Sequence, residues 1–206
     1  MRFDGLSGTI RAENRNMNLF SSRYGPRIRP TGLQQHLGID LVCPLRDGNN
    51  NAQGGIGNVP IIAVTSGRTT DRSANTSGTG YRISIESDEF FCPLTGRPLI
   101  FTVMHMVAPA SVGQGISVTR GQTIGYVGDT GSTGAIHLHF EVTSRGFVNF
   151  NHSRETRLPY SIDPTFFYPA GTFYWAPWWQ GTTLLRDQRT RNFTLWSETQ
   201  TARSEW

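Results

Sequence analysis

The sequence contains no lysine, so all 19 of its basic side chains are arginines. Against 15 acidic residues they give a formal net charge of +4. A basic surface suits an anionic partner such as a cell envelope, a nucleic acid or an acidic protein. The arginines are scattered, however, and no basic run or nucleic-acid motif is present. We therefore expect no nucleic-acid partner.

Long apolar runs are also missing. No stretch approaches the ~18 consecutive apolar residues of a membrane span, so we expect no transmembrane segment. The opening MRFDGLSGTIRAENRNM lacks the apolar core of a secretory signal peptide. The sequence therefore predicts either that a signal has been removed or that the protein is exported by another route.

Cysteine is scarce, with only Cys43 and Cys92. Their spacing is unlike that of a cysteine-rich zinc site. In an oxidising compartment they would form one disulfide, and otherwise they would be two buried thiols. The sequence leaves both possibilities open.

Sustained helical periodicity is absent as well. Short apolar or alternating runs are instead separated by turns rich in the 23 glycines and 11 prolines, which favours strands over helices. We expect one strand over residues 36–44, a strand followed by a turn over 59–70, further strands over 81–88 and 99–107, and several short ones within 112–142. The prediction is a mainly β fold built on antiparallel sheet, with few or no long helices.

Histidine is also rare, with five residues, yet two of them stand one residue apart in GAIHLHFEV. In a strand, His137, His139 and Glu141 share one face, and the residues between them form an apolar face for the core. In HLGIDLV, the same alternation puts His36 and Asp40 on one face. Two strands would thus each present a pair of polar side chains from an apolar support.

Imidazoles and carboxylates are the ligands of catalytic zinc sites, which keep one position open for water. His105, in FTVMHMV, is a third strand histidine that could reach the same place. Taken singly, each of these residues is more simply explained as a core or surface residue, but their combination favours a metal site. Glu141 could orient a ligand, pack or face solvent, and we expect His152 to be exposed and without a role.

The run GDTGSTG, residues 128–134, is rich in glycine like a phosphate-binding loop. It lacks the Gly-Lys-Ser/Thr ending that phosphate binding requires. We expect a tight turn that leads into the following strand.

Taken together, several blocks resemble the lysostaphin-like zinc metallopeptidases, which cleave peptidoglycan peptides. The blocks span about residues 21–169, and in order they are SSRYGPRIRPTG, HLGIDL, VPIIAVTSGRTT, FTVMHMV, the Gly-rich block ending in HLHFEV, and SIDPTFFYP. HxxxD or HxH alone would be a weak signal. The two together, with GSTGAIHLHFEV around the second, are highly specific.

The resemblance implies a small antiparallel sheet with a metal-binding groove that holds one Zn²⁺. It implies that His36, Asp40 and His139 bind the metal and that His105 and His137 lie unligated beside it. Strand alternation alone does not decide between His137 and His139 as the ligand. In hydrolysis by a zinc-activated water, the two unligated imidazoles would share the tasks of general base and oxyanion donor.

The implied function is a zinc endopeptidase of peptidoglycan cross-links or stem peptides, acting at the cell wall or in the periplasm. A phage-associated lysin, an injected antibacterial effector and an autolysin all fit, and an effector would imply a cognate inhibitor protein as partner. One alternative is a catalytically inactive wall-binding or regulatory module, which the presence of all five expected side chains disfavours. Another is a zinc hydrolase with a different substrate.

The expected organisation is a polar N-terminal segment over residues 1–20, the metallopeptidase domain over 21–169, and a Trp-rich tail over 170–206. We expect the tail to pack on the domain rather than bind a partner. Two insertions, 46–58 and about 88–98, are expected near the groove rim, where they would alter specificity.

Overall fold

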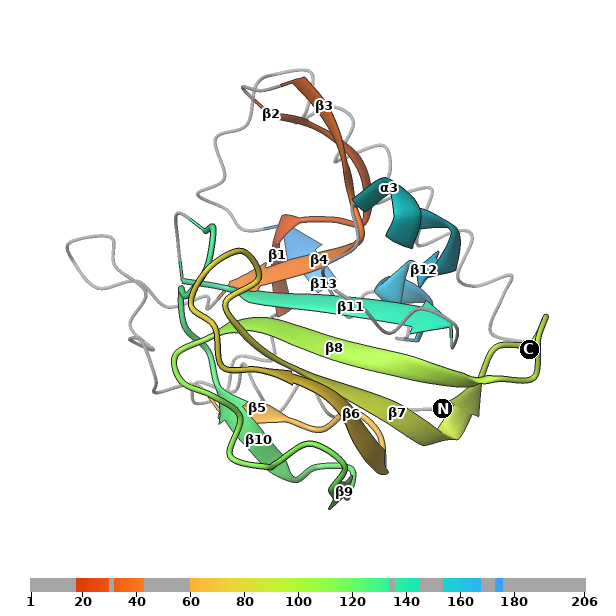
Figure 1. Cartoon of the computed structure of the whole chain (residues 1–206). Coiled ribbons are helices and arrows are strands. Elements are labelled where there is room, and N and C mark those ends of the chain that lie inside the picture. The colour runs from red at the N-terminus through yellow and green to blue at the C-terminus, as the bar shows by residue number, and fades with distance from the viewer. Residues whose placement is uncertain are drawn as a thin grey trace.

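The computed structural model describes residues 18–29, 32–42, 60–133, 136–144, 154–167 and 173–175. Most of them form one sheet with the strand order β13-β1-β4-β11-β8-β7-β6-β9, to which β12 adds beside β11 (Figure 1). The strands of this sheet are β1 (Asn18–Ser22), β4 (Gly38–Val42), β6 (Gly67–Ser73), β7 (Tyr81–Phe91), β8 (Pro98–Met106), β9 (Ser117–Val118), β11 (Leu138–Ser144), β12 (Ser161–Ile162) and β13 (Phe173–Trp175). Only the β1–β13 pair is parallel among the strand pairs of the described residues.

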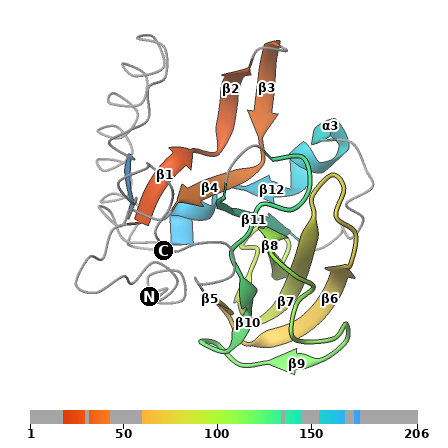
Figure 2. The same ribbon diagram turned by 90° about the vertical axis from the view of Figure 1, so that its left-hand side faces the viewer.

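Two small sheets accompany the main one. The first pairs β5 (Pro60–Ile62) with β10 (Thr123–Tyr126). The second is the hairpin of β2 (Gly25–Arg29) and β3 (Gly32–His36), which projects away from the main sheet (Figures 1 and 2).

Helix is confined to short turns in the described residues. These are α3 (Arg154–Arg157), η1 (Leu158–Tyr160) and η2 (Pro164–Phe167). The prediction of a mainly antiparallel β fold with few or no long helices is therefore confirmed. No helix within the described ranges is long and apolar enough to cross a membrane.

The core lies on the apolar face of the central strands. On β11, Leu138, Phe140 and Val142 are each at most 2% exposed, as the alternation predicts. Phe101 of β8 stacks on Phe140 at 6.2 Å between ring centroids. Burying side chains of this size contributes about 1.5–3 kcal/mol each. The opposite face of β11 therefore rests on a packed support.

The prediction of one continuous strand through residues 36–44 is wrong at Leu37. His36 ends β3 of the projecting hairpin, and β4 begins at Gly38 in the main sheet. The chain changes sheets at this point, and Leu37 is only 2% exposed. The break thus joins the hairpin to the sheet next to His36.

The predicted insertion at about 88–98 is the end of the β7–β8 hairpin, because β7 continues to Phe91 and β8 starts at Pro98. Its turn carries Leu94, which is 93% exposed. Cys92 nearby is a buried free thiol. Cys43, His152, the insertion 46–58 and most of the Trp-rich tail lie outside the described residues.

Candidate functional site

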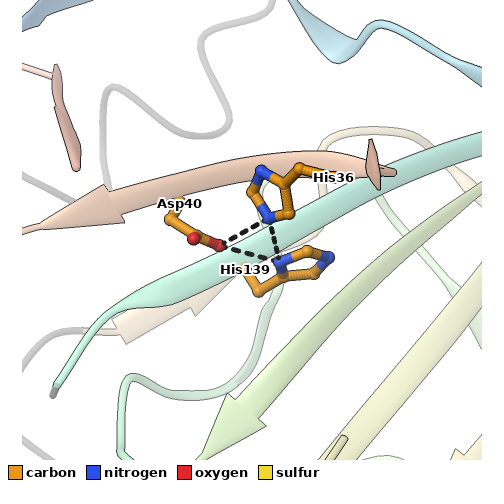
Figure 3. A group of neighbouring side chains, drawn as sticks. All are labelled: His36, Asp40 and His139. Atoms are coloured by element: carbon orange, nitrogen blue, oxygen red, sulfur yellow. Dashed lines mark hydrogen bonds and ion pairs between the residues drawn. The ribbon is translucent and has the colours of Figure 1, made fainter. Parts of the chain in front are cut away.

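Three of the predicted site residues meet where β3, β4 and β11 come together (Figure 3). Asp40 Oδ1 lies 3.1 Å from His36 Nε2 and 2.8 Å from His139 Nδ1. His36 Nε2 and His139 Nδ1 are 3.1 Å apart. Two ligand atoms of a tetrahedral zinc ion, each about 2.1 Å from it, lie only about 3.4 Å apart. The three atoms are therefore spaced much as ligands of one ion are.

The β4–β11 register produces this meeting. His139 is the direct partner of Asp40 across the antiparallel pair. Gly38, two residues before Asp40, lies so close to β11 that a Cβ there would collide with the Phe140 carbonyl oxygen and approach His139 Nε2 to 2.9 Å. Glycine at this position lets the two strands come together at the site.

His36 and His139 each have one ring nitrogen that points away from the group of three ligand atoms, and the hydrogen bonds of these nitrogens suit metal binding. His36 Nδ1 lies 2.6 Å from the carbonyl oxygen of Arg23, which can only accept, so Nδ1 donates and Nε2 keeps its lone pair. His139 Nε2 lies 3.0 Å from Glu141 Oε1, so Nε2 donates to this carboxylate and Nδ1 can offer its lone pair. Metal-binding histidines are commonly held in this way by a carbonyl or a carboxylate. The donor set therefore fits Zn²⁺.

Glu141 is itself held by an arginine. The Glu141 carboxylate is almost fully buried, and Arg157, at the end of α3, donates to it at 3.0 and 3.3 Å. Of the alternatives for Glu141, the structure thus supports orientation of a ligand. A buried carboxylate needs such a partner, because an unpaired buried charge is costly.

Asp40 is held from the hairpin side. Arg27 of β2 donates from Nη1 to Asp40 Oδ2 at 3.2 Å and to Ser22 Oγ at 2.9 Å. The Gln34 side chain of β3 accepts from the same guanidinium at 3.2 and 3.3 Å. The second carboxylate oxygen of Asp40 is thus engaged, and Oδ1 is left facing the two imidazoles.

The charges of the site shift its pKa values strongly. Burial alone would raise the pKa of Asp40, but the electrostatic effect of the adjacent His36 and the hydrogen bond from His139 hold it well below its usual value. Burial would lower the pKa of His139, but its bonds to Asp40 and Glu141 raise it to about 9. Asp40 is therefore an anion at neutral pH, and a metal ion must displace a proton from His139.

The other two predicted histidines lie beside this group. The rings of His105 and His137 are 4.8 Å apart, and His137 Nε2 lies 3.6 Å from Asp40 Oδ1. His105, at the end of β8, has φ of 62°, a strained value for a residue other than glycine. Burial, followed by the charge of His137, lowers the pKa of His105 to about 4. His105 is therefore neutral at physiological pH.

An open pocket of about 390 Å³ runs over the site. It is lined on one side by Ser73 at the end of β6 and by Asn75, Ser77 and Thr79 of the polar turn before β7, and elsewhere by His36, His105, His139, Arg27, Arg82 and Arg157. The site is thus open to a substrate.

All five side chains predicted for the site come together in the structure. Sequence reasoning missed Arg27 and Arg157, which hold Asp40 and Glu141. Neither has a distinguishing neighbourhood among the 19 arginines. The one available signal was indirect: a carboxylate buried in the site needs a basic partner, but this does not say which arginine supplies it.

Comparison with known proteins agrees with this arrangement. The sequence profile of Peptidase family M23 matches residues 34–151. The catalytic domain of the antimicrobial peptidase lysostaphin from Staphylococcus simulans is 26% identical with a TM-score of 0.52, over 72% of this chain and 90% of that domain. LytU is 26% identical with a TM-score of 0.51, over 77% of this chain and 89% of LytU. No curated protein matches the sequence. With the profile covering more than half of the chain and the His36–Asp40–His139 group intact, the chain belongs to Peptidase family M23 and is a zinc metallopeptidase.

Proposed function

We propose that this zinc peptidase hydrolyses peptide bonds of bacterial peptidoglycan, in the cross-links or in the stem peptides. The observation that carries the proposal is the convergence of His36 Nε2, Asp40 Oδ1 and His139 Nδ1 beside the imidazoles of His105 and His137, next to an open pocket that His36, His105 and His139 line. Wall peptides are the substrate that the sequence blocks imply, and the similar lysostaphin domain is an antimicrobial peptidase. The net charge of +4 suits an anionic wall.

His36, Asp40 and His139 are the proposed zinc ligands. When bound, zinc supplies the Lewis acidity that activates water and polarises the scissile carbonyl. The protein holds each ligand from behind, through the Arg23 carbonyl, Arg27 and Glu141. These contacts turn the three metal-facing atoms toward one another and leave the proton on His139 Nδ1 as the one that a metal displaces.

His105 and His137 are proposed to share the proton transfers and the stabilisation of the oxyanion. His105 is neutral and donates from Nδ1 to the Thr130 carbonyl oxygen at 2.7 Å, so its Nε2 can accept a proton from the attacking water. His137 Nε2 lies 3.6 Å from Asp40 Oδ1, and His137 can donate to the oxyanion or the leaving amine when protonated.

We further propose that the metallopeptidase domain occupies residues 21–169 and works at the cell wall. The profile match over 34–151 falls inside this segment. Strand β13, in the tail, pairs with Asn18–Phe20 of β1, just before the proposed domain, and β1 pairs in turn with β4 of the main sheet, which supports a tail that packs on the sheet.

The experiment that tests the function is digestion of purified muropeptides, read by mass spectrometry. The panel contains glycine-bridged and D-amino-acid-linked cross-links, and zinc content is measured on each sample. We expect the wild type to cleave one of these linkages. We expect His139→Ala to lose zinc and activity, and His105→Ala to keep zinc but lose activity by about 100-fold or more.

Asp88→Asn, at an exposed carboxylate of β7, is the matched control and should behave as the wild type. A wild-type protein that holds zinc and leaves the whole panel uncut would overturn the substrate assignment. A His139→Ala variant with full zinc and full activity would overturn the ligand assignment.

A further inference from the structure

The Gly-rich segment of residues 128–133, after β10, has so far entered the chemistry only through the Thr130 carbonyl oxygen, which accepts from His105. Hydrogen bonds and close backbone packing hold it against the neighbouring turn. Ser132 N donates to the Gly78 carbonyl oxygen at 2.7 Å, and Gly128 forms a bridge with His137. Gly131, with φ of 91°, packs so closely on Gly78 and Gly80 that a Cβ would collide with their backbone. The segment therefore has a fixed position next to the imidazoles.

Thr130 is the residue of this segment that contacts His105. Its carbonyl oxygen lies 2.7 Å from His105 Nδ1. Its hydroxyl donates to the Met106 carbonyl oxygen at 2.6 Å and accepts from the Tyr81 backbone N–H at 3.1 Å. One side chain thus ties together the end of β8 and the start of β7, while its main chain holds the imidazole.

The backbone of His105 is held by the turn against which this segment packs. His105 N donates to the Thr79 carbonyl oxygen at 3.2 Å, and the residue takes its left-handed φ there. A strained conformation of this kind persists only where the surroundings impose it. Thr79, Thr130 and the Met106 carbonyl supply such surroundings.

The contact with Thr130 also selects a tautomer. A carbonyl oxygen only accepts, so His105 Nδ1 must carry the proton and Nε2 must carry the lone pair. The contact of His137 differs, because Nδ1 lies 3.2 Å from Thr133 Oγ1, and a hydroxyl can either donate or accept. The Thr130 contact thus fixes the tautomer of His105, whereas the Thr133 contact by itself is compatible with either tautomer of His137.

We propose that Thr130 is a positioning residue, whose hydroxyl anchors the main chain so that its carbonyl holds His105 with Nε2 ready to accept a proton. The proposal rests on the proposed function insofar as His105 acts in hydrolysis. The tautomer of His105 can be measured whether or not peptidoglycan is the substrate.

The test compares Thr130→Val, which keeps the branched shape but loses both hydroxyl hydrogen bonds, with Thr130→Ser, which keeps them. The tautomer of His105 is read from ¹⁵N–¹H correlation spectra of the zinc-loaded protein, with assignment by His105→Gln. Wild type and Thr130→Ser should show the proton on Nδ1. Thr130→Val should show a mixture of tautomers with unchanged zinc content.

On the cleaved muropeptide, Thr130→Val should lower kcat by about 10- to 100-fold through misplacement of the imidazole, with KM within about twofold. Thr130→Ser should restore most of kcat. In a His105→Gln background, Thr130→Val should have little further effect, because a residue that acts through His105 has nothing left to position.

A wild-type His105 with its proton on Nε2 would overturn the proposal without any variant. The proposal would also be overturned if Thr130→Val lowered kcat as much in the His105→Gln background as it does in the wild type, since the effect would then not act through His105. If the wild type cleaves no muropeptide, the proposed function fails, and the spectra alone still decide the positioning role.

Discussion

At the scale of single residues, the site depends on a histidine held between two carboxylates. His139 Nδ1 faces Asp40, and its Nε2 faces Glu141, which Arg157 supports in turn. The outer carboxylate keeps a proton on Nε2, so that the nitrogen that gives up its proton to a metal is Nδ1. The chain of contacts therefore selects which atom of His139 binds zinc.

Glu141→Gln should weaken zinc binding by about 10- to 100-fold, because an amide orients the imidazole without the charge that raises its basicity. Competition with a chromophoric chelator measures the affinity. Asp88→Asn removes an exposed carboxylate of β7 and should leave the affinity unchanged. Equal affinities for Glu141→Gln and the wild type would show that the outer carboxylate does not act on the metal site.

The proton on His139 predicts a pH dependence. The pKa of His139 in the metal-free protein is raised to about 9. Its contribution to the stability of that state is therefore present below about pH 6.5 and is lost as the pH rises through about 9. Zinc competes with this proton, so its affinity should rise about tenfold per pH unit between about pH 7 and pH 9 and then level off. A constant affinity over that range would contradict the assignment.

At the scale of elements, the site requires β4 and β11 to lie unusually close. Gly38 has no room for a side chain because the Phe140 carbonyl oxygen and the Glu141 and His139 side chains occupy that space. Gly38→Ala should therefore lower the free energy of unfolding by about 1–3 kcal/mol and reduce zinc content. Thermal unfolding and metal analysis measure both effects.

Gly113→Ala is the matched control, since a Cβ there meets only Ile116 Cγ1 at an ordinary 3.5 Å. It should change neither stability nor zinc content appreciably. A Gly38→Ala protein as stable and as zinc-rich as this control would mean that the close approach of the two strands is not needed.

The β2–β3 hairpin is joined to the site through Arg27. Removing the guanidinium in Arg27→Ala takes away a charge-assisted hydrogen bond to Asp40, a bond typically worth about 1.5–3 kcal/mol. Backbone amides of β3 should then exchange at least about tenfold faster with solvent, as hydrogen-exchange mass spectrometry can measure. Unchanged protection of residues 32–36 would contradict this anchoring role.

The strands also show which parts of the structure can be predicted from the sequence. Alternation of period two correctly predicted the faces of β11, because its apolar residues all enter the core. It failed at Leu37, where the chain leaves the hairpin and joins the sheet. The apolar periodicity does not reveal the change of sheet, because Leu37, Ile39 and Leu41 would be buried in one continuous strand and are also buried in the observed structure.

At the scale of the whole molecule, the site brings together residues far apart in sequence. Asp40 and His139 are separated by 99 positions, and the β4–β11 register pairs them directly. Periodicity indicates on which face of a strand a residue lies, but not which strand lies beside it. The meeting of Asp40 and His139 was therefore predicted only from the resemblance to a known family. Arg157 ends the one-turn helix α3 and Thr130 lies outside the strands, and both places are too short or too irregular for a periodic signal to indicate their contacts.

The central claim is that one zinc ion is held by His36, Asp40 and His139, and X-ray absorption at the zinc edge tests it most directly. The wild type, loaded with one zinc per chain, should show two imidazoles and a carboxylate at about 2.0–2.2 Å. His137→Ala should keep both imidazoles, whereas His139→Ala should lose one or fail to bind zinc. Loss of an imidazole in His137→Ala, with none lost in His139→Ala, would contradict the account.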